Sequence, residues 1–395
     1  MASSRGRMSR FLRPRVEAVG LEIGTSALKV VELRPGNPPG LAALGLRPMP
    51  PGLVQDDQII DAPGLAAEIK ALFDEAGIRK RHVVSAVSNR QAITRNIMVP
   101  KMTLQELEEA IKWEAERYIP FPIDEVELDF YVLDNPDDVH EGGQLEVVIA
   151  AARLDLLTQQ VETLRLAGLE PIVIDIKPFA LLRSLKGALL GEHLTKTTLS
   201  GSGYTEANEI GVVLEIAASN TTITLVRGER VLMNRNIGVS GDDFTAAVQR
   251  VFGLDFDSAE DVKLQYGTAT IPSEDEEELL NFDAKREQFS PSRVYEALRP
   301  VLIELTTEIR RSLEFFRVQT GDANISRMLV TGGGAKLRGL SEAVGDTLGV
   351  RTEVGDPWLT VAADSNRFDR AYLQGVGPAF AVPLGLALRG VSGLD

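Results

Sequence analysis

The chain of 395 residues contains no cysteine and only three histidines. Without thiols it can form no disulfide, no thiolate metal site and no cysteine nucleophile. The histidines, His82, His140 and His193, are scattered and lack the close spacing of zinc ligands. These absences exclude a disulfide-stabilised fold and argue against a structural zinc site.

Long apolar runs are also missing. None approaches the roughly 18 residues needed to cross a bilayer, and the longest candidate, residues 379–388, is interrupted by Pro383. No apolar stretch typical of a signal peptide follows the arginine-rich start of the chain. We therefore expect a protein that does not span a membrane and stays in the cytoplasm.

Positive charge is in deficit, because 42 Lys and Arg face 57 Asp and Glu, for a net charge of −15. No basic stripe is available to a phosphate backbone, so we expect no nucleic-acid partner. Residues 1–15 carry arginines and no acidic residue. They predict a basic flexible tail, with contact to an anionic membrane surface or a partner as the alternative. The length and the 44% hydrophobic composition allow two or more globular domains.

The first part of the chain alternates between strand and helix patterns. Residues 18–33 predict two strands joined by a tight turn. Residues 65–76 have helical spacing, end at Gly77 and lead into an apolar strand at 82–87. A helix opens at Thr103 with a capping box to Glu106, and an acidic segment, a strand at 147–152 and a helix closed by Gly168 follow. Residues 91–165 are therefore predicted to form a compact module.

The second part opens after residues 185–208, whose Gly, Ser and Thr predict a surface loop at the boundary of two lobes. Strand character returns at 210–226. Helices are expected after Gly241, after a cap at Ser258, and from Ser290 and Pro291, with a kink at Pro300. The acidic run 274–278 predicts a solvated loop.

An internal echo is the clearest motif. The segment Leu21-Glu22-Ile23-Gly24-Thr25-Ser26 is repeated as Leu214-Glu215-Ile216-Ala217-Ala218-Ser219, each followed by a second apolar strand. Small residues at such tips let backbone N–H groups approach phosphate oxygens. A carboxylate beside each tip, Glu22 or Glu215, could hold the water shell of Mg²⁺.

A third element places three glycines directly after a strand. Gly332, Gly333 and Gly334 follow Leu329-Val330-Thr331, and a backbone without side chains can lie flat against adenosine. Glycine turns after strands are common, so any one of these elements alone is weak. Their order along the chain is far more specific.

That order resembles the actin-like ATPase superfamily, and within it the FtsA-like branch and the PilM family of type IV pilus assembly proteins. The resemblance spans about 16–390, and its most particular stretches are Val99-Pro100-Lys101-Met102, residues 113–122, Asp175-Ile176-Lys177-Pro178-Phe179 and Ala259-Glu260-Asp261-Val262-Lys263. It implies an α/β, two-lobed actin-like fold with a module of the type called 1C or SHS2 in the first lobe. The implied division is a first-lobe core (1A) at 16–90 and 166–205, the module at 91–165, a second-lobe core (2A) at 206–245 and 320–395, and a subdomain (2B) at 246–319.

The resemblance also implies ATP and Mg²⁺ as ligands. Glu260 and Lys263, which share one helical face, would reach the ribose and base, although an exposed helix also forms such surface ion pairs. Glu22 and Glu215 would hold the metal, through water. The full set of implied nucleotide contacts is Gly24, Thr25, Ser26, Lys29, Ala218, Ser219, Asn220, Thr221, Glu260, Lys263, Gly332, Gly333, Gly334 and Lys336.

The chain departs from the superfamily pattern in the phosphate region. Glu22 and Glu215 stand where aspartate is usual, and Ala217 where glycine is usual. Lys177-Pro178 occupies the place of a Glu-Pro pair that positions the hydrolytic water in related chaperones. Because an ammonium cannot accept a proton, we expect ATP to be held more readily than it is hydrolysed. The alternative for Lys177 is a helix-start residue facing solvent.

The resemblance implies a scaffold role at the inner face of the cytoplasmic membrane. Its partners would be the N-terminal cytoplasmic peptide of PilN and other pilus platform proteins, with the module as the binding platform. Trp113, Tyr118 and Phe121 could line the peptide groove, although aromatic residues at such spacing are more often core. A filament-forming cell-division ATPase like FtsA and a small-molecule kinase are the alternatives.

Overall fold

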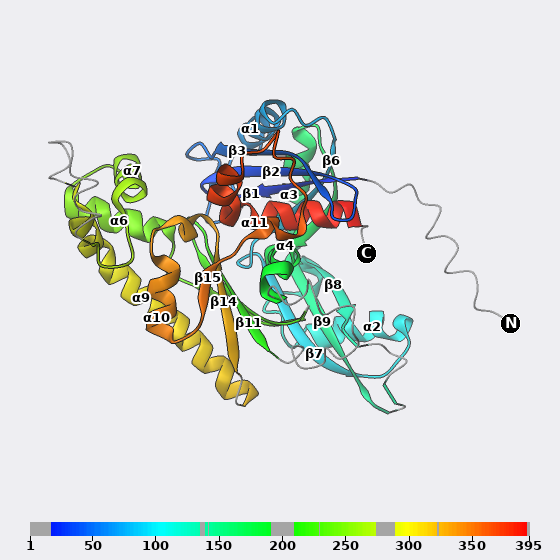
Figure 1. Ribbon diagram of the computed structural model, residues 1–395. Coiled ribbons are helices and arrows are strands. Elements are labelled where there is room, and N and C mark those ends of the chain that lie inside the picture. The colour runs from blue at the N-terminus through cyan, green and yellow to red at the C-terminus, as the bar shows by residue number, and fades with distance from the viewer. Residues whose placement is uncertain are drawn as a thin grey trace.

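The computed structural model describes residues 17–134, 139–140, 142–190, 209–228, 230–273, 289–321 and 324–392. It has two lobes, each built on a five-stranded mixed sheet, with a smaller third sheet at the side of the first lobe (Figure 1). The predicted basic tail, the acidic run 274–278 and most of the predicted loop 185–208 lie outside the described residues. The helix α4 (Lys177–Leu190) continues past the predicted start of that loop.

The first sheet has the order β10-β6-β1-β2-β3. Its hairpin β1-β2 is antiparallel, β6 pairs with β1 in parallel, and β10 pairs with β6 in parallel. The turn between β1 and β2 is closed by the Gly24 N–H, which donates to Ala27 O at 3.1 Å. The predicted first hairpin is therefore confirmed. The strands are β1 (Val19–Ile23), β2 (Ala27–Arg34), β3 (Gly40–Pro48), β6 (His82–Val87) and β10 (Glu170–Ile176).

The second sheet repeats this topology in the order β13-β12-β11-β14-β15. Again a three-stranded antiparallel meander comes first. Of the two strands that follow it, β14 pairs in parallel with β11, and β15 pairs in parallel with β14. The sequence echo thus reflects two lobes of the same design. The strands are β11 (Ile210–Ile216), β12 (Thr221–Arg227), β13 (Arg230–Ile237), β14 (Ile325–Thr331) and β15 (Thr352–Val354).

Two helices, α4 and α11 (Arg370–Ser392), lie between the sheets (Figure 1). Residues of both helices, among them Leu185 and Leu386, form one core with Val84 of the first sheet and Val213 and Leu329 of the second. Burial of this apolar surface from both sheets fixes the lobes to a common centre.

The helix α11 differs from expectation in two respects. It continues through Pro378 and Pro383, and the stretch Arg370–Val391 is long and apolar enough to cross a membrane, but 72% of its apolar window is buried inside the protein. A buried core helix accounts for this composition.

We assigned this end of the chain to the second lobe, yet α11 packs mainly on α4, β1 and β2. An added Cβ on Gly20 or Gly385 would come within about 2 Å of a backbone oxygen, at 2.1 Å from Pro383 O and 1.9 Å from Ala180 O.

The predicted module has its own core. Its sheet has the order β7-β9-β8, and α2 covers one face through Leu107 and Ile111. The capping box of Thr103 and Glu106 is present. The helix α3 (Leu154–Leu166), which we placed in the module, packs on α1 (Ala62–Glu75), and its Leu164 belongs to the first-lobe core. The module elements are β7 (Ala92–Pro100), α2 (Leu104–Ala115), η1 (Ile123–Glu125), β8 (Val126–Val132) and β9 (Gln144–Arg153).

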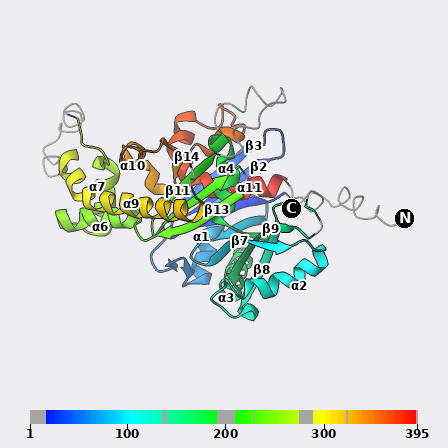
Figure 2. The same ribbon diagram turned by 90° about the horizontal axis from the view of Figure 1, so that it is seen from below.

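The second lobe carries its helices on the outer side of its sheet (Figures 1 and 2). The predicted cap at Ser258 is wrong, because Asp255 accepts the N–H of Ser258 and starts α7 three residues earlier. Ser290 does cap the long helix α9, and Pro300 lies inside it. The division into four subdomains stays a prediction. The remaining elements are β4 (Val54–Gln55), β5 (Gln58–Ile59), α6 (Gly241–Phe252), α7 (Phe256–Tyr266), α9 (Pro291–Thr320), η4 (Gly333–Lys336), α10 (Leu340–Leu348) and η5 (Pro357–Thr360).

Candidate functional site

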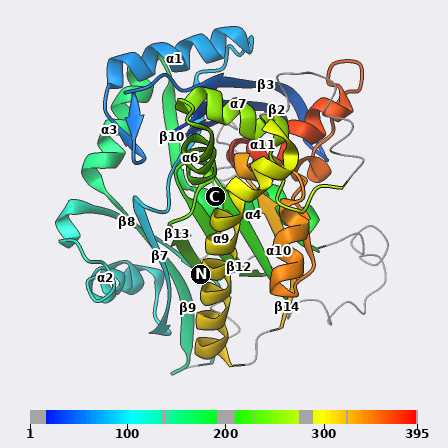
Figure 3. The same cartoon turned by 90° about the vertical axis from the view of Figure 1, so that its left-hand side faces the viewer.

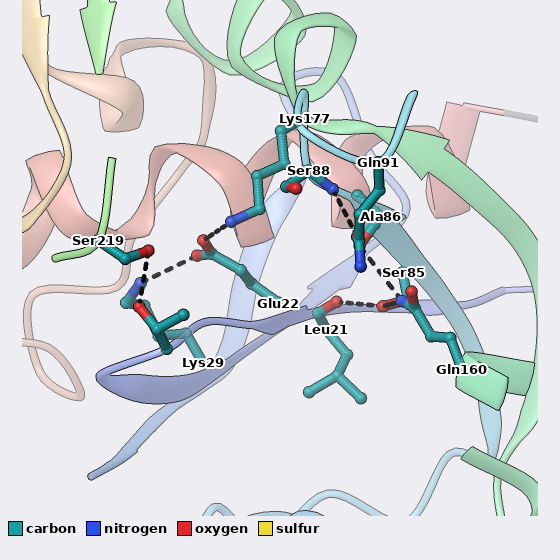
Figure 4. A network of polar contacts seen from close by, with 11 residues as sticks. Leu21, Glu22, Lys29, Ser85, Ala86, Ser88, Gln91, Gln160, Lys177 and Ser219 are labelled. Atoms are coloured by element: carbon teal, nitrogen blue, oxygen red, sulfur yellow. Dashed lines mark hydrogen bonds and ion pairs between the residues drawn. The ribbon is translucent and has the colours of Figure 1, made fainter. Parts of the chain in front are cut away.

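The tips of the two echoed hairpins meet between the lobes. The hydroxyl of Thr25 donates to the hydroxyl of Ser219 at 3.2 Å across 194 positions of sequence. The second tip is closed as the first one is, since the Ala217 N–H donates to Asn220 O at 2.9 Å. The structure therefore brings the predicted phosphate residues of both lobes to one place, which Figure 4 shows in part.

Glu22, on β1 below the first tip, is buried and fully engaged. Its Oε2 pairs with Lys29 Nζ at 3.0 Å, and its Oε1 pairs with Lys177 Nζ at 3.2 Å (Figure 4). Burial alone would raise the pKa of this carboxyl, but the two ammonium groups outweigh burial and hold the pKa below its usual value. Glu22 is therefore a carboxylate at neutral pH.

Glu215, the counterpart on β11, is also buried but differs in charge environment. Burial raises its pKa, Lys177 partly offsets this, and the nearby Glu22 adds to the rise. Two similar sequence positions thus produce one stabilised carboxylate and one carboxyl that resists ionisation. Within the described part of the chain, no group of three or more histidine or carboxylate side chains is arranged to hold a metal ion directly.

Lys177 starts α4 and points inward, so the alternative of a solvent-facing residue is wrong. It is 8% exposed. Burial would lower its pKa, but Glu22, Glu215 and Asp57 outweigh burial and raise it above the ordinary value for lysine. The side chain is a permanent cation at the junction of both lobes, and it has no capacity to act as a base.

Asp57 is a site residue that the sequence analysis missed. It lies in the turn between β4 and β5, with a left-handed φ of 63°, and its Oδ2 is buried without a partner. Ser88 Oγ is also buried without a hydrogen-bond partner. Both residues line a cavity beside Lys177 with a volume of about 20 Å³. That volume suits about one water molecule. The two-residue strands around Asp57 gave no periodic signal that could have revealed it.

The glycine turn follows β14 and packs directly on the second lobe's first strand. An added Cβ at Gly334 would lie 2.3 Å from Ile216 Cγ2, and one at Gly332 would lie 2.4 Å from Ile216 O. A Cβ at Gly333 would meet nothing within 4 Å. Gly333 therefore faces open space, whereas its neighbours are needed for packing. Lys336, at the end of the turn, has a lowered pKa because of burial and the nearby charge of Lys29.

The predicted adenosine residues lie on α7 and contact α6. Lys263 Nζ pairs with Glu260 Oε2 at 2.6 Å and donates to Thr245 Oγ1 at 2.8 Å and Gly241 O at 3.2 Å. The start of α6 in turn contacts the second tip, since Gly241 N donates to Ala217 O at 2.9 Å. The ion pair is thus partly buried and connected to the hairpin. Asp242 beside it has a pKa raised to about 6, mainly by burial.

The three aromatic residues proposed for the peptide groove are not core. Trp113, Tyr118 and Phe121 are 73%, 44% and 40% exposed, so the core alternative is wrong. Phe121 lies under the guanidinium of Arg153, 5.9 Å from the ring centroid. We call these three exposed side chains, one on α2 and two in the residues that follow it, the exposed aromatic surface.

Comparisons with known proteins agree with this architecture. A solved structure described as the PilM-PilN type IV pilus biogenesis complex superposes with a TM-score of 0.81 at 48% identity, over 96% of this chain and 99% of the other. MreB5 of Spiroplasma citri bound to AMPPNP superposes with a TM-score of 0.50 at 13% identity, over 95% and 96%, and shows the fold alone. The predicted two-lobed actin-like fold is confirmed.

A cell-division protein, FtsA of Agrobacterium fabrum, is 26% identical over 192 residues, which are 46% of this chain and 40% of FtsA. That alignment therefore spans less than half the length of the relative. The sequence model of the family described as type IV pilus assembly protein PilM matches residues 20–391, nearly the whole chain. The chain belongs to the family of type IV pilus assembly proteins PilM.

Proposed function

We propose that the protein is a cytoplasmic, ATP-binding scaffold of the type IV pilus assembly platform and binds the N-terminal cytoplasmic peptide of PilN. The observation that carries this proposal is the match along nearly the whole chain, at 48% identity, to a structure described as the PilM-PilN complex. The alternatives of a filament-forming FtsA and a small-molecule kinase are not favoured by it. The protein would work at the inner face of the cytoplasmic membrane, held there by its partner.

The residues at the hairpin tips suit a nucleotide. Burial and then the nearby charge of Lys29 lower the pKa of Lys336, and two such neighbouring cations favour an anion between them. The small tips Gly24-Thr25-Ser26 and Ala218-Ser219-Asn220-Thr221 offer backbone N–H groups and hydroxyls, and the buried Thr221 Oγ1 has no partner of its own. Gly333 leaves open space for the adenosine. A fold neighbour, MreB5, is described as bound to AMPPNP.

Magnesium would be held through water, and mainly by one of the two carboxyls. Each oxygen of Glu22 already accepts from one ammonium, Lys29 or Lys177, so Glu22 has less acceptor capacity left for the metal's water shell. Glu215 makes no ion pair among the described residues and is the better candidate for the hydrated ion. The bound metal would neutralise phosphate charge and so stabilise the closed arrangement of the lobes.

Slow turnover follows from the same cluster. A general base must accept a proton from water, and Lys177 stands charged at the position where relatives place an acid. We expect phosphate release well below the roughly 1 per second at the low end of typical enzymes. Rapid release that is lost in Glu22→Ala would contradict this and favour a motor or a kinase.

The test of the scaffold function is calorimetry with a synthetic N-terminal peptide of PilN and the full chain. A second protein has residues 93–152 replaced by a short linker, so that α3, which packs in the first lobe, is retained. We expect binding to the full chain and none to the deletion variant, and Trp113→Ala should weaken binding if the exposed aromatic surface takes part. Full affinity in a folded deletion variant would place the peptide site elsewhere.

A further inference from the structure

The module is attached to the second lobe as well as to the first. The chain connects it to the first lobe through residues 88–91 and into α3, but its edge strand β7 lies beside β13, the edge strand of the second sheet (Figures 2 and 3). Two edge strands from different sheets therefore meet without forming a common ladder. Side chains make the connection between them.

The central contact is made by Arg230 at the start of β13. Its Nη1 pairs with Glu146 Oε2 of β9 at 2.6 Å, and its Nη2 pairs with Asp134 Oδ1 at 3.2 Å. Asp134 and Glu146 are themselves joined, because Asp134 Oδ2 accepts the Glu146 N–H at 2.7 Å. The guanidinium thus closes a small network whose acidic members both belong to the module. We call Arg230, Asp134, Glu146 and Asn96 the Arg230 bridge.

Asn96 completes the bridge from β7. Its Nδ2 donates to Val231 O on β13 at 3.1 Å and to Glu146 Oε1 at 3.0 Å. One further contact lies closer to the nucleotide, where Asn89 Nδ2 donates to Asn234 Oδ1 at 3.1 Å. Asn96 is exposed and the Arg230 side chain is 41% exposed, whereas the side chains of Asp134 and Glu146 are 28% and 23% exposed. Salt therefore screens the acidic side of the bridge less than it screens a fully exposed ion pair.

The bridge and the nucleotide tips lie at opposite ends of one strand. Ile237, at the end of β13, pairs with Thr221 at the second tip, whereas Arg230 pairs with Arg227 at the far end. Seven residues of extended strand span roughly 23 Å at about 3.3 Å each. Because β13 is held in the sheet by β12 along its length, a rotation of the second lobe moves both ends together.

We propose that the Arg230 bridge couples the module to closure of the second lobe, so that a nucleotide at the tips shifts the module although it touches no module residue. Opening of the lobes must either break the bridge or pull the module along. By linkage, a ligand on the module changes the affinity for the nucleotide by the same factor by which the nucleotide changes the affinity for that ligand. The nucleotide arm of this inference rests on the proposed function, whereas the contact itself does not.

The test is hydrogen exchange of the full chain with and without Mg-ATP, for wild type, Arg230→Glu and the matched control Arg235→Ala. Arg235 lies on the same strand but is exposed. Without nucleotide, Arg230→Glu should speed exchange in β7 by about fivefold or more, because a repulsive contact replaces two ion pairs. Arg235→Ala should match wild type, and the charge swap Arg230→Glu/Glu146→Arg should restore slow exchange.

With Mg-ATP, exchange should slow at both hairpin tips and at β7 in wild type, but only at the tips in Arg230→Glu. Protection of β7 that survives Arg230→Glu, or unchanged exchange of β7 in the nucleotide-free variant, would overturn the coupling. Absence of protection at the tips in wild type would instead refute the nucleotide site. Exchange at β7 therefore tests the coupling, and exchange at the tips tests the nucleotide site.

Discussion

The two echoed hairpins share their topology and a similar first strand and tip, but the pKa values of their carboxyls shift in opposite directions. Glu22 is held ionised by Lys29 and Lys177, and its pKa is lowered. Glu215 has no ammonium in direct contact among the described residues, and burial raises its pKa. The difference arises because Lys29 and Lys177 both come from the first lobe. The repeated motif thus produces the same hairpin in both lobes, and the neighbouring lysines determine whether its carboxyl is ionised.

The largest expected effect comes from removing the cation that serves both hairpins. Lys177→Met should lower the free energy of unfolding by about 3 kcal/mol, because it leaves buried carboxylates with one ammonium fewer. Denaturant unfolding measures this. The double variant Lys177→Met/Glu22→Gln should recover part of the loss, since it removes the uncompensated charge as well. A Lys177→Met variant as stable as wild type would show that Lys177 does not stabilise the buried carboxylates.

A second test separates two neighbouring glycines beside the second hairpin. ATP with Mg²⁺ at about 100 times its Kd should stabilise the protein by about 2.7 kcal/mol. Gly333→Asp should abolish this stabilisation with little change in the free protein, because its carboxylate enters the open space proposed for the adenosine and has no compensating cation there. Gly334→Ala should instead destabilise the free protein by about 1 to 3 kcal/mol, because its Cβ would overlap Ile216. Thermal unfolding with and without nucleotide distinguishes them.

An unchanged melting temperature of wild type at millimolar ATP would contradict the nucleotide site. A Gly333→Asp variant that keeps the full shift would place the adenosine away from this turn.

The third test addresses the two carboxyls by pH. Glu22, with its lowered pKa, contributes stability that is present above its usual pKa of 4.5 and is lost as pH falls through the lowered value. Glu215, with its raised pKa, favours the fold when protonated, so its contribution is lost as pH rises through that value. At pH 7, Glu22→Gln should destabilise and Glu215→Gln should stabilise, each by about 1 kcal/mol.

Both differences should shrink toward pH 4. Effects of the same sign in the two variants would show that the hairpins are electrostatically equivalent after all. Lys177 stays charged throughout this range and adds no slope of its own.

The smallest expected effect concerns Asp242, at the start of the helix that contacts the second tip. Its pKa of about 6 means that stability is lost as pH rises through 6. Asp242→Asn should remove that slope and stabilise the protein at pH 8 by a few tenths of a kcal/mol, discounted because the group is only half-buried. Thermal unfolding at pH 5 and pH 8 measures the change, and an unaltered slope would exclude Asp242 as its source.

Much of this site was predictable because it follows from local pattern. The hairpin tips, the glycine turn and the capping box at Thr103 are each specified by a few neighbouring residues. Lys177 was identified, but its inward position was not, since the carboxylates that it faces come from distant parts of the chain, Glu22 and Glu215 on strands and Asp57 in a turn. Asp57 was invisible, because only tertiary packing brings the turn between β4 and β5 to α4. The sequence also could not show that Arg230 would reach the module, as the two segments are about 90 positions apart.

The position of α11 has a consequence for folding during synthesis on the ribosome. This helix, the last described element, packs against Gly20 on β1, the first described strand, and closes the centre that both lobes share. The first lobe therefore cannot complete its core until α11 has been synthesised. The face of its sheet that α11 covers stays accessible to chaperones until then.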